Sequence, residues 1–344
     1  MNPLAKRSLG KSGVDLPILG FGGAQLSSDM QPIEDSQAQE TLHEAWRCGV
    51  RYYDTSPWYG LGLSELRVGH FLRQQARDEF LLSTKVGRVL SACSDGAESQ
   101  DLPRSGLGFP FFHRVDYTYD GVMRSYEDST QRLGLNRIDL LLIHDLDYLF
   151  FETEAELDER FVELDSGWKA LAELKASGRI KGIGAGINEE KVISKYLDCY
   201  DLDFFLIAMP YTLLHQKTLE LEFPRIERNG VGVIIGSPHA GGILATGPGT
   251  DIRYHGKTVP REIEDRVRAI QGVCRRHDVD MKAAALQFPL GHASVASVIP
   301  GSKHPAEVSD NLEMMKVSIP MDFWNELRSE GLLHQDAPVP HDQS

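Results

Sequence analysis

Residues 50–60 read VRYYDTSPWYG, and this stretch decides the fold. An apolar, aromatic-rich run stops at Asp54, a polar turn follows, and the aromatic pair Trp58 and Tyr59 comes just beyond the turn. A buried strand that ends in a carboxylate, with a phenol five residues later, places two ionisable groups at one rim of a sheet. Taken alone, the pattern favours an ordinary strand, turn and solvated acid. The functional interpretation therefore depends on what the rest of the chain supplies.

Short apolar runs alternate with helical periodicity on both sides of this stretch. The runs predict strands at 16–21, 50–54, 80–85, 139–144, 180–187, 204–209, 231–236 and 294–299. They are continuously apolar, which is typical of strands covered on both faces in a parallel sheet. Eight strand–helix units predict a closed (β/α)8 barrel, with a doubly wound sheet as the main alternative.

The segments between these units complete the predicted organisation. Two glycine turns near the N-terminus predict a short hairpin before the first strand. Long connections are expected after strands three and four, at 86–117 and 145–167. No composition shift or flexible linker divides the chain, so residues 1–344 are expected to form one domain.

The composition of the chain limits which partners the protein is expected to bind and where in the cell it is expected to lie. The formal net charge is −14 and the pI is near 5.3, a balance that disfavours nucleic acid and anionic membranes as partners. The four cysteines are far apart and form no C-x-x-C pair, which indicates reduced thiols rather than disulfides or a zinc site. No apolar run is long enough to span a membrane, and the first residues lack the apolar core of a signal peptide. We expect a cytoplasmic protein that holds no metal and acts on a small molecule.

Three consecutive strands end on an ionisable side chain: Asp54, Lys85 and His144, with Tyr59 just after the first of them. In a barrel these groups meet at the C-terminal rim, where chemistry is built. A buried lysine needs a carboxylate partner, and its ammonium favours the phenolate of a neighbouring tyrosine. His144 can donate a hydrogen bond to the same substrate oxygen. This set suits proton transfer at a carbonyl or alcohol oxygen, while the hydride that moves at carbon requires a cofactor.

Several segments together resemble the aldo-keto reductase superfamily: GFGGA (20–24), YDTSPWYG (53–60), LLSTKVGR (81–88), LGLNRIDLLLIHDLD (133–147) and VIPGSKHPAEVSDNL (298–312). The resemblance implies the (β/α)8 barrel and reversible hydride transfer with a nicotinamide dinucleotide. It also implies a catalytic tetrad of Asp54, Tyr59, Lys85 and His144. Within the superfamily the chain looks most like the D-threo-aldose (L-fucose), L-galactose and pyridoxal 4-dehydrogenases, which chiefly oxidise a cyclic hemiacetal to a lactone.

The resemblance also supplies candidate binding residues. The cofactor is expected to contact Gly23, Ala24, Asp54, Asn188, Ser237, Pro238, Ile299, Gly301, Ser302, Lys303, Glu307, Asp310 and Asn311. The substrate is expected to contact Trp58, Tyr59, His113, His144 and Asp145. The sequence departs from the usual pattern at Ala208, where a glutamine is common, and at Gly236, where an aromatic residue usually stacks on the nicotinamide.

Glu307 bears on the choice between NAD and NADP. Family members that use NADP usually have an arginine here, against the 2′-phosphate. A carboxylate would repel that phosphate and accept a hydrogen bond from a free ribose hydroxyl. Lys303 is a signal in the other direction, because it can meet a phosphate. We expect NAD, with NADP as the alternative.

The function expected from these observations is oxidation of an aldose such as L-fucose, L-galactose or D-arabinose to its lactone, with Tyr59 as general acid and base. Oxidation of pyridoxal to 4-pyridoxolactone and broad carbonyl reduction are alternatives. From other functional classes, we also considered a nucleotide-binding regulatory subunit and a glycoside hydrolase that pairs Asp54 with Asp145. The series Gly182-x-Gly184-x-Gly186 resembles a dinucleotide fingerprint, but its spacing favours a close-packed barrel strand.

Overall fold

The eight expected strands form one parallel sheet in the order β14-β11-β10-β9-β8-β5-β4-β3. The computed structural model describes residues 1–27, 32–92, 108–249, 253–254 and 257–340. The strands of the sheet are β3 (Phe21–Gly22), β4 (Tyr52–Asp54), β5 (Leu81–Val86), β8 (Leu140–His144), β9 (Gly182–Ile187), β10 (Phe204–Ala208), β11 (Gly232–Gly236) and β14 (Val295–Ile299). The predicted strands are therefore present and in the predicted order.

Backbone hydrogen bonds between the first and last strands close the sheet. The amide of Gly20 donates to the Val298 carbonyl at 2.9 Å, and the amide of Val298 donates to the Ile18 carbonyl at 2.9 Å. A parallel bridge between Gly22 and Gly301 extends this contact toward the C-terminal rim. A closed sheet has no unpaired edge. The barrel prediction is thus confirmed over the doubly wound alternative.

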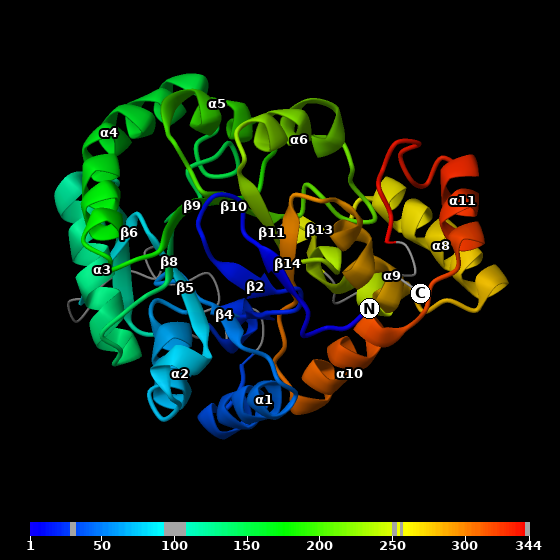
Figure 1. Cartoon of the computed structure of the whole chain (residues 1–344), viewed down its shortest axis with the longest axis horizontal. Coiled ribbons are helices and arrows are strands. Elements are labelled where there is room, and N and C mark those ends of the chain that lie inside the picture. The colour runs from blue at the N-terminus through cyan, green and yellow to red at the C-terminus, as the bar shows by residue number, and fades with distance from the viewer. Residues whose placement is uncertain (28–31, 93–107, 250–252, 255–256, 341–344) are drawn as a thin grey trace.

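A ring of helices surrounds the sheet (Figure 1). The ring contains α1 (Asp35–Arg47), α2 (Leu63–Leu72), α3 (Tyr119–Leu133), α4 (Glu154–Ala176), α5 (Val192–Cys199), α6 (Thr218–Arg228), α9 (Met281–Gln287) and α10 (Pro305–Lys316). Helices α8 (Arg261–His277) and α11 (Met321–Ser329) pack on each other at the outer side. Shorter elements are α7 (Ile243–Thr246), β12 (Arg253–Tyr254), β13 (Lys257–Thr258) and 3-10 turns at 23–27, 77–79, 240–242 and 288–291. In the described part of the chain, no helix has the length and apolar character needed to cross a membrane.

The strands bury side chains on both faces. In β8, Leu140 and Leu142 join the cluster that fills the barrel interior, while Leu141 and Ile143 join the cluster beneath the helices. All four side chains are fully buried. The alternation of the pleat therefore explains why the strand sequences read as continuous apolar runs.

The N-terminal hairpin covers the bottom of the barrel. Its strands are β1 (Lys6–Ser8) and β2 (Asp15–Pro17), and β2 lies over the barrel centre in Figure 1. Arg7 Nη1 donates to the carbonyls of Leu290 at 2.8 Å and Val295 at 3.0 Å. Gly10, with a φ of 50°, lies so close to the start of β11 that an added Cβ would be 2.2 Å from the Gly232 nitrogen. The opposite, C-terminal rim is left for the ionisable strand ends.

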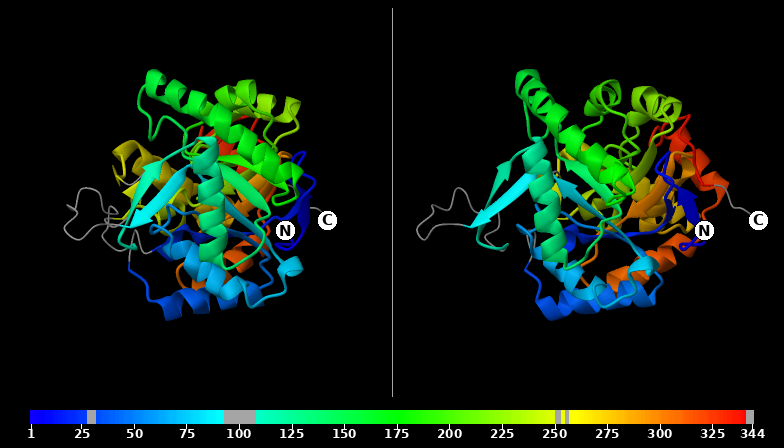
Figure 2. Two further views of the ribbon diagram at one scale, coloured as in Figure 1. Left: turned by 90° about the vertical axis from the view of Figure 1, so that its left-hand side faces the viewer. Right: turned by 60° about the vertical axis from the view of Figure 1, so that its left-hand side comes forward.

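Three predictions about chain segments need correction. The expected first strand at 16–21 is divided between β2 and β3, because Ile18–Gly20 cross from the hairpin to the barrel. The expected loop at 86–117 contains an antiparallel hairpin, β6 (Arg88–Ala92) and β7 (Phe111–Val115), which stands out from the barrel in Figure 2. Residues 93–107 of that segment lie outside the described residues.

The expected loop at 145–167 ends much earlier, because α4 begins at Glu154. Thr153 and Glu156 form a reciprocal capping box at its start, which satisfies two backbone amides. The first half of α4 is acidic, and its buried residues are Leu157, Phe161 and Leu164 at helical spacing. The prediction failed here because one narrow apolar stripe within an acidic segment was interpreted as a loop.

Candidate active site

The rim at the C-terminal ends of β4, β5 and β8 brings the four ionisable groups together. Asp54 and His144 are the last residues of β4 and β8, and Lys85 lies near the end of β5. Tyr59 lies in the segment between β4 and α2. Asp54, Lys85 and His144 are at most 3% exposed. The sequence prediction that these groups share one rim agrees with this arrangement.

Lys85 is the centre of the cluster. Its Nζ donates to Asp54 Oδ2 at 2.7 Å, to the Thr55 carbonyl at 2.8 Å and to the Tyr59 hydroxyl at 3.1 Å. These three acceptors satisfy all three N–H donors of an ammonium. Burial lowers the pKa of Lys85, but Asp54 and Tyr59 raise it by more, so its pKa lies above the ordinary value. Lys85 is therefore a charged group held in a dry site.

Asp54 is fixed from its other side by a hydroxyl relay. Ser83 Oγ donates to Asp54 Oδ1 at 2.7 Å, and the Tyr52 hydroxyl lies 2.9 Å from the same Ser83 oxygen. Both carboxylate oxygens are thus engaged by hydrogen bonds. Asp54 is a counter-ion with a fixed orientation, and a pairing of Asp54 with Asp145 for glycoside hydrolysis finds no support in this geometry.

Two opposing effects act on the pKa of the Tyr59 hydroxyl. Burial raises its pKa to about 12, and the Lys85 ammonium lowers that pKa without cancelling the effect of burial. The expected influence of Lys85 is present, but the net pKa is above the ordinary value because burial disfavours the phenolate more strongly. Tyr59 is consequently protonated at neutral pH.

His144 is positioned by Ser56. The Ser56 hydroxyl lies 3.0 Å from His144 Nδ1 and accepts a hydrogen bond from the Trp58 amide at 3.0 Å. In the tautomer in which Ser56 donates to Nδ1, Nε2 carries the N–H. Burial, together with the charges of Lys85 and Arg88, holds the pKa of His144 well below its ordinary value. The imidazole is thus a neutral donor, edge-on to the Tyr59 ring at 5.8 Å between centroids.

A second charged cluster lies next to His144. Asp145 Oδ1 accepts a hydrogen bond from Asn188 Nδ2 at 2.9 Å, and Asp145 Oδ2 lies 3.5 Å from Arg88 Nη2. Asn188 also donates its backbone amide to Asp147 Oδ2 at 2.6 Å. Burial raises the pKa of Asp145 to about 6, and Arg88 opposes that shift.

Ring contacts place two more predicted substrate residues in this cluster. The Trp58 and His113 rings lie edge to face at 4.2 Å between centroids, and the Arg88 guanidinium lies 4.7 Å from the Trp58 ring. Burial, assisted by Arg88, lowers the pKa of His113 to about 4, so this imidazole is neutral. Arg88 thus lies next to both Asp145 and the Trp58–His113 ring pair.

Sequence reasoning missed Ser56, Arg88 and Asp147. Ser56 and Asp147 lie inside quoted motifs, two residues beyond Asp54 and three beyond His144, so their place after strand ends was a usable signal. An arginine that follows Lys85-Val86-Gly87 is indistinguishable in sequence from a surface arginine. Its burial results from the β6–β7 hairpin, for which the sequence carried no clear pattern.

The predicted adenosine residues gather at the start of α10. Asn311 Nδ2 donates to Ser302 Oγ at 3.2 Å, and Glu307 Oε2 accepts the Lys303 backbone amide at 2.8 Å. Asp310 forms an ion pair with Lys282 from α9. The segment before α10 is therefore held in one conformation by its own side chains.

The predicted residues near the ring end of the cofactor lie on other strand ends. Gly301 forms a bridge with Gly22, and an added Cβ at Gly23 would meet the Asp54 carbonyl at 2.6 Å. Ser237, directly after β11, accepts the Gly241 amide at 3.1 Å. Ala24, Pro238 and Ile299 adjoin these residues in sequence.

The ends of β9, β10 and β11 fit a flat cofactor ring. Gly186, Ala208 and Gly236 end the inward faces of β9, β10 and β11, because each lies two residues beyond an inward-facing position. No side chain there is longer than a methyl group, and the nearest atom to a Cβ added at Gly186 would be Lys85 Cε at 3.6 Å. Nearby, the buried Nε2 of His239 has no hydrogen-bond partner among the described residues. Small residues at the strand ends beside Lys85 and a buried polar atom on the loop after β11 are compatible with a bound dinucleotide.

The close-packed interpretation of Gly182–Gly186 is confirmed. These residues lie in β9, and a Cβ at Gly184 would come within 2.6 Å of the Phe204 ring. Asp203 accepts hydrogen bonds from the Ile183 amide at 2.8 Å and from Lys175 at 2.7 Å. The motif is therefore structural.

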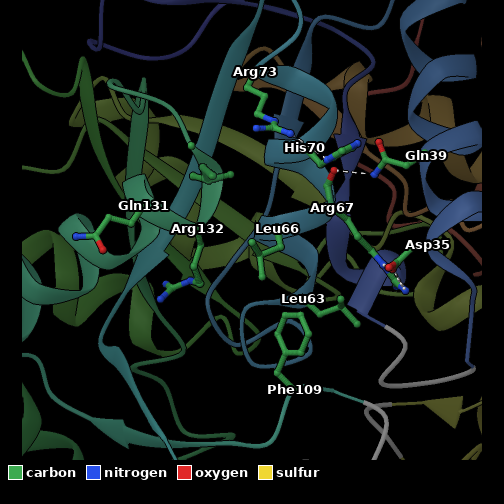
Figure 3. Close-up of a pocket in the computed structure, with 12 residues that line it drawn as sticks. Asp35, Gln39, Leu63, Leu66, Arg67, His70, Arg73, Phe109, Gln131 and Arg132 are labelled. Atoms are coloured by element: carbon green, nitrogen blue, oxygen red, sulfur yellow. Dashed lines mark hydrogen bonds and ion pairs between the residues drawn. The ribbon is translucent and has the colours of Figure 1, made fainter.

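A separate cavity of about 470 Å³ lies outside the barrel between α1, α2 and α3. Figure 3 shows Leu63, Leu66 and Phe109 on one side of it and the arginines Arg67, Arg73 and Arg132 around it. Arg67 is paired with Asp35, and Arg132 with the buried Glu65. None of the four rim residues lines this cavity, so it is not the place where the tetrad would meet a substrate.

Comparison with known proteins agrees with the geometry. A family profile described as "Aldo/keto reductase family" matches residues 18–330. The chain is 37% identical to pyridoxal 4-dehydrogenase from Microbacterium luteolum, over 95% of this chain and 98% of the relative. It is 37% identical to D-threo-aldose 1-dehydrogenase from Pseudomonas sp., over 94% and 96%. It is 28% identical to L-galactose dehydrogenase from Arabidopsis thaliana, over 91% and 88%.

Solved structures share the fold. The holo form of aldo-keto reductase AKR11C1 from Bacillus halodurans superposes with a TM-score of 0.75 at 24% identity, covering 98% of this chain and 99% of that one. The glycerol dehydrogenase AKR11B4 from Gluconobacter oxydans superposes with a TM-score of 0.71 at 18% identity, covering 98% of both chains. At these identities the likeness establishes the barrel.

The buried Lys85–Asp54 ion pair predicts that removing one charge destabilises the protein more than removing both. Lys85→Met strands the Asp54 carboxylate without its cation, and we expect a loss of about 3–5 kcal/mol in the free energy of unfolding. The double variant Asp54→Asn/Lys85→Met removes the stranded charge and should recover part of that loss. Urea unfolding followed by circular dichroism measures both.

Lys195→Met is the matched control, because Lys195 pairs with Glu154 and Asp158 at the surface and its loss should cost at most about 1 kcal/mol. The single variant Asp54→Asn is measured as well. If the double variant lost as much free energy of unfolding as Lys85→Met and Asp54→Asn lose together, the assignment of Asp54 as the counter-ion would be contradicted.

Proposed function

The chain belongs to the aldo/keto reductase family, and on that premise we propose that it oxidises a cyclic aldose hemiacetal to its lactone with NAD as the hydride acceptor. The observation that carries this proposal is the hydrogen-bonded series Asp54–Lys85–Tyr59 beside a neutral His144 at one rim. Two of the similar relatives are named for aldose oxidation. L-fucose, L-galactose and D-arabinose are the sugars to test first.

Proton transfer is the task of Tyr59. In the oxidising direction its phenolate accepts the proton of the substrate hydroxyl, and in reverse its hydroxyl returns it. Lys85 remains charged throughout, because Asp54 holds it, and it stabilises the phenolate from 3.1 Å. His144 donates from Nε2 to the same substrate oxygen and orients it. Because all four groups are mostly buried, their interactions are little weakened by solvent.

A bound nicotinamide dinucleotide supplies the hydride acceptor. We propose that Asn188 and Ser237 hold its ring end and that Ser302, Asp310 and Asn311 hold its adenosine end. Glu307 faces the segment before α10, where it is fixed by the Lys303 amide. A carboxylate at this place accepts a hydrogen bond from a ribose hydroxyl and repels a 2′-phosphate, so NAD is the preferred form.

Pyridoxal is the second candidate substrate. The face-to-edge pair of Trp58 and His113 beside the tetrad offers aromatic surface to a pyridine ring. One relative of equal identity is a pyridoxal 4-dehydrogenase. The same NADH assay at alkaline pH, run with pyridoxal and with the three sugars, separates the two candidates.

Replacing Tyr59 should stop the chemistry without removing the cofactor. In Tyr59→Phe we expect kcat for aldose oxidation to fall by about 10²–10⁴-fold, because the proton acceptor is lost. NADH binding, measured by fluorescence titration, should stay within about threefold of the native value. Tyr119→Phe is the control, because the Tyr119 hydroxyl donates to the exposed Glu173 and Tyr119 is not one of the predicted site residues. Full activity of Tyr59→Phe would refute the proposed role.

The raised pKa of Tyr59 predicts different pH profiles for oxidation and for carbonyl reduction. Oxidation requires the phenolate, whose fraction rises about tenfold per pH unit below a pKa of about 12. We therefore expect kcat/KM for oxidation to keep rising through the alkaline range. Carbonyl reduction requires the protonated hydroxyl and should show no loss from this group until much higher pH. An oxidation profile that levels off near neutral pH would show that another group limits the reaction.

The cofactor preference should reverse when Glu307 is changed. The native protein is expected to give a higher kcat/KM with NAD+ than with NADP+. Glu307→Arg should shift that ratio toward NADP+ by about 10- to 100-fold, because a phosphate partner replaces a repelling carboxylate. Glu313→Arg, on the same helix and paired with Lys316, should leave the ratio unchanged. Equal or better use of NADP+ by the native protein would overturn the preference for NAD.

A further inference from the structure

Arg88 is a buried cation, and two of its nitrogen atoms make no hydrogen bond within the described part of the chain. It is the first residue of β6, two residues beyond the end of β5, and is 4% exposed. Its Nε and Nη2 atoms are buried without hydrogen-bond partners among the described residues. The guanidinium lies between the rings of Trp58 at 4.7 Å and Phe150 at 4.8 Å. Buried donors without acceptors are costly, so a bound ligand is a candidate to complete them.

Asp145 offers an unused acceptor beside these donors. Its Oδ2 lies 3.5 Å from Arg88 Nη2 and 3.4 Å from His144 Nε2, both longer than an ordinary hydrogen bond. Its Oδ1 is already engaged by Asn188. The backbone of Asp145 is left-handed, with a φ of 53°, a strained conformation that commonly marks functional sites. Donors and an acceptor thus stand together next to the imidazole that orients the reacting oxygen.

We propose that Arg88 and Asp145 together bind two adjacent hydroxyl groups of a polyhydroxylated substrate, so that Arg88 determines specificity for the reaction. One hydroxyl accepts from the guanidinium, and its neighbour donates to Asp145 Oδ2. This inference rests on the proposed function, whose substrate class it narrows to compounds with a vicinal diol near the reacting carbon.

Other substrate classes match the pair less well. An anionic substrate would meet Arg88 but would also face the carboxylates of Asp145 and Asp147, which share Asn188 as a partner. An apolar aldehyde would leave the Arg88 donors buried and unpaired, which costs free energy. A neutral diol satisfies both charges, and the fixed guanidinium plane between two rings gives that recognition a defined geometry.

The test compares two three-carbon aldehydes, glyceraldehyde and propanal, which differ by a vicinal diol. Both are offered as substrates for reduction by NADH, and kcat and KM are measured separately. In Arg88→Met and in Asp145→Asn, we expect the ratio of kcat/KM for glyceraldehyde to that for propanal to fall about 10- to 100-fold, mainly through the KM for glyceraldehyde. The double variant should lose less than the product of the two single losses, because both residues bind one diol.

Controls separate this role from a structural one. Arg114→Met changes an exposed arginine of the neighbouring strand β7 and should leave the ratio unchanged. Arg88→Lys retains a buried cation and should recover part of the ratio, and thermal melting verifies that each variant is folded.

An unchanged ratio in Arg88→Met, or an equal loss for both aldehydes in folded protein, would overturn the inference. Loss of activity on glyoxylate in Arg88→Met, with a gain in Asp145→Asn, would also overturn it by indicating an anion site. Failure of the native protein to oxidise any aldose while it still prefers glyceraldehyde would count against the proposed function and leave the diol inference standing.

Discussion

The buried contact between Lys85 and Asp54 is the interaction on which the rest of the site depends. A lysine without its carboxylate would lose its proton in this environment, and Tyr59 would then lose the cation that makes its phenolate accessible. The Ser83–Tyr52 relay fixes the carboxylate, so the ammonium has one position. Tyr59 and Lys85 belong to different segments, and the hydrogen bond from Lys85 Nζ to the Tyr59 hydroxyl couples them directly. The chemistry of the rim is therefore a consequence of one satisfied ion pair.

Closure of the barrel places that pair correctly. Adjacent parallel strands put Asp54 opposite Ser83, and Lys85 opposite Leu142, two residues before His144. The N-terminal hairpin covers the bottom of the barrel, so the C-terminal rim is the end at which side chains can meet small molecules. Apolar side chains fill the interior between the two ends and keep water from the lysine side of the site.

Strain is concentrated at the same rim. Asp145, Met209 and Ser237 are the first residues after β8, β10 and β11, and all three have left-handed backbones. This conformation costs each about 1–2 kcal/mol relative to the right-handed alternative. Such strain persists only where the surrounding structure holds it, and it is common at sites that bind ligands. Here it occurs at Asp145, beside His144, and at Ser237, which is a predicted cofactor residue.

The sequence by itself determined the fold class and which four ionisable groups meet at the rim. Continuous apolar runs that alternate with helical segments indicate strands buried on both faces. The ionisable residue at the end of three of these runs marks the rim. Both signals are local, so they can be found in the sequence. Asp54, Tyr59, Lys85 and His144 could be found in this way. The early start of α4 was missed, because its apolar stripe is narrow and its first half is acidic.

Only the tertiary structure decided which groups are buried together. Arg88 has no local signature, and its burial between Trp58 and Phe150 comes from the packing of the β6–β7 hairpin against the loop after β8. The pKa of Tyr59 likewise depends on a balance between burial and a cation that lies 26 residues away in sequence. Desolvation and charge pairing act across space, so composition and spacing could name the participants but could not set their protonation states or their neighbours.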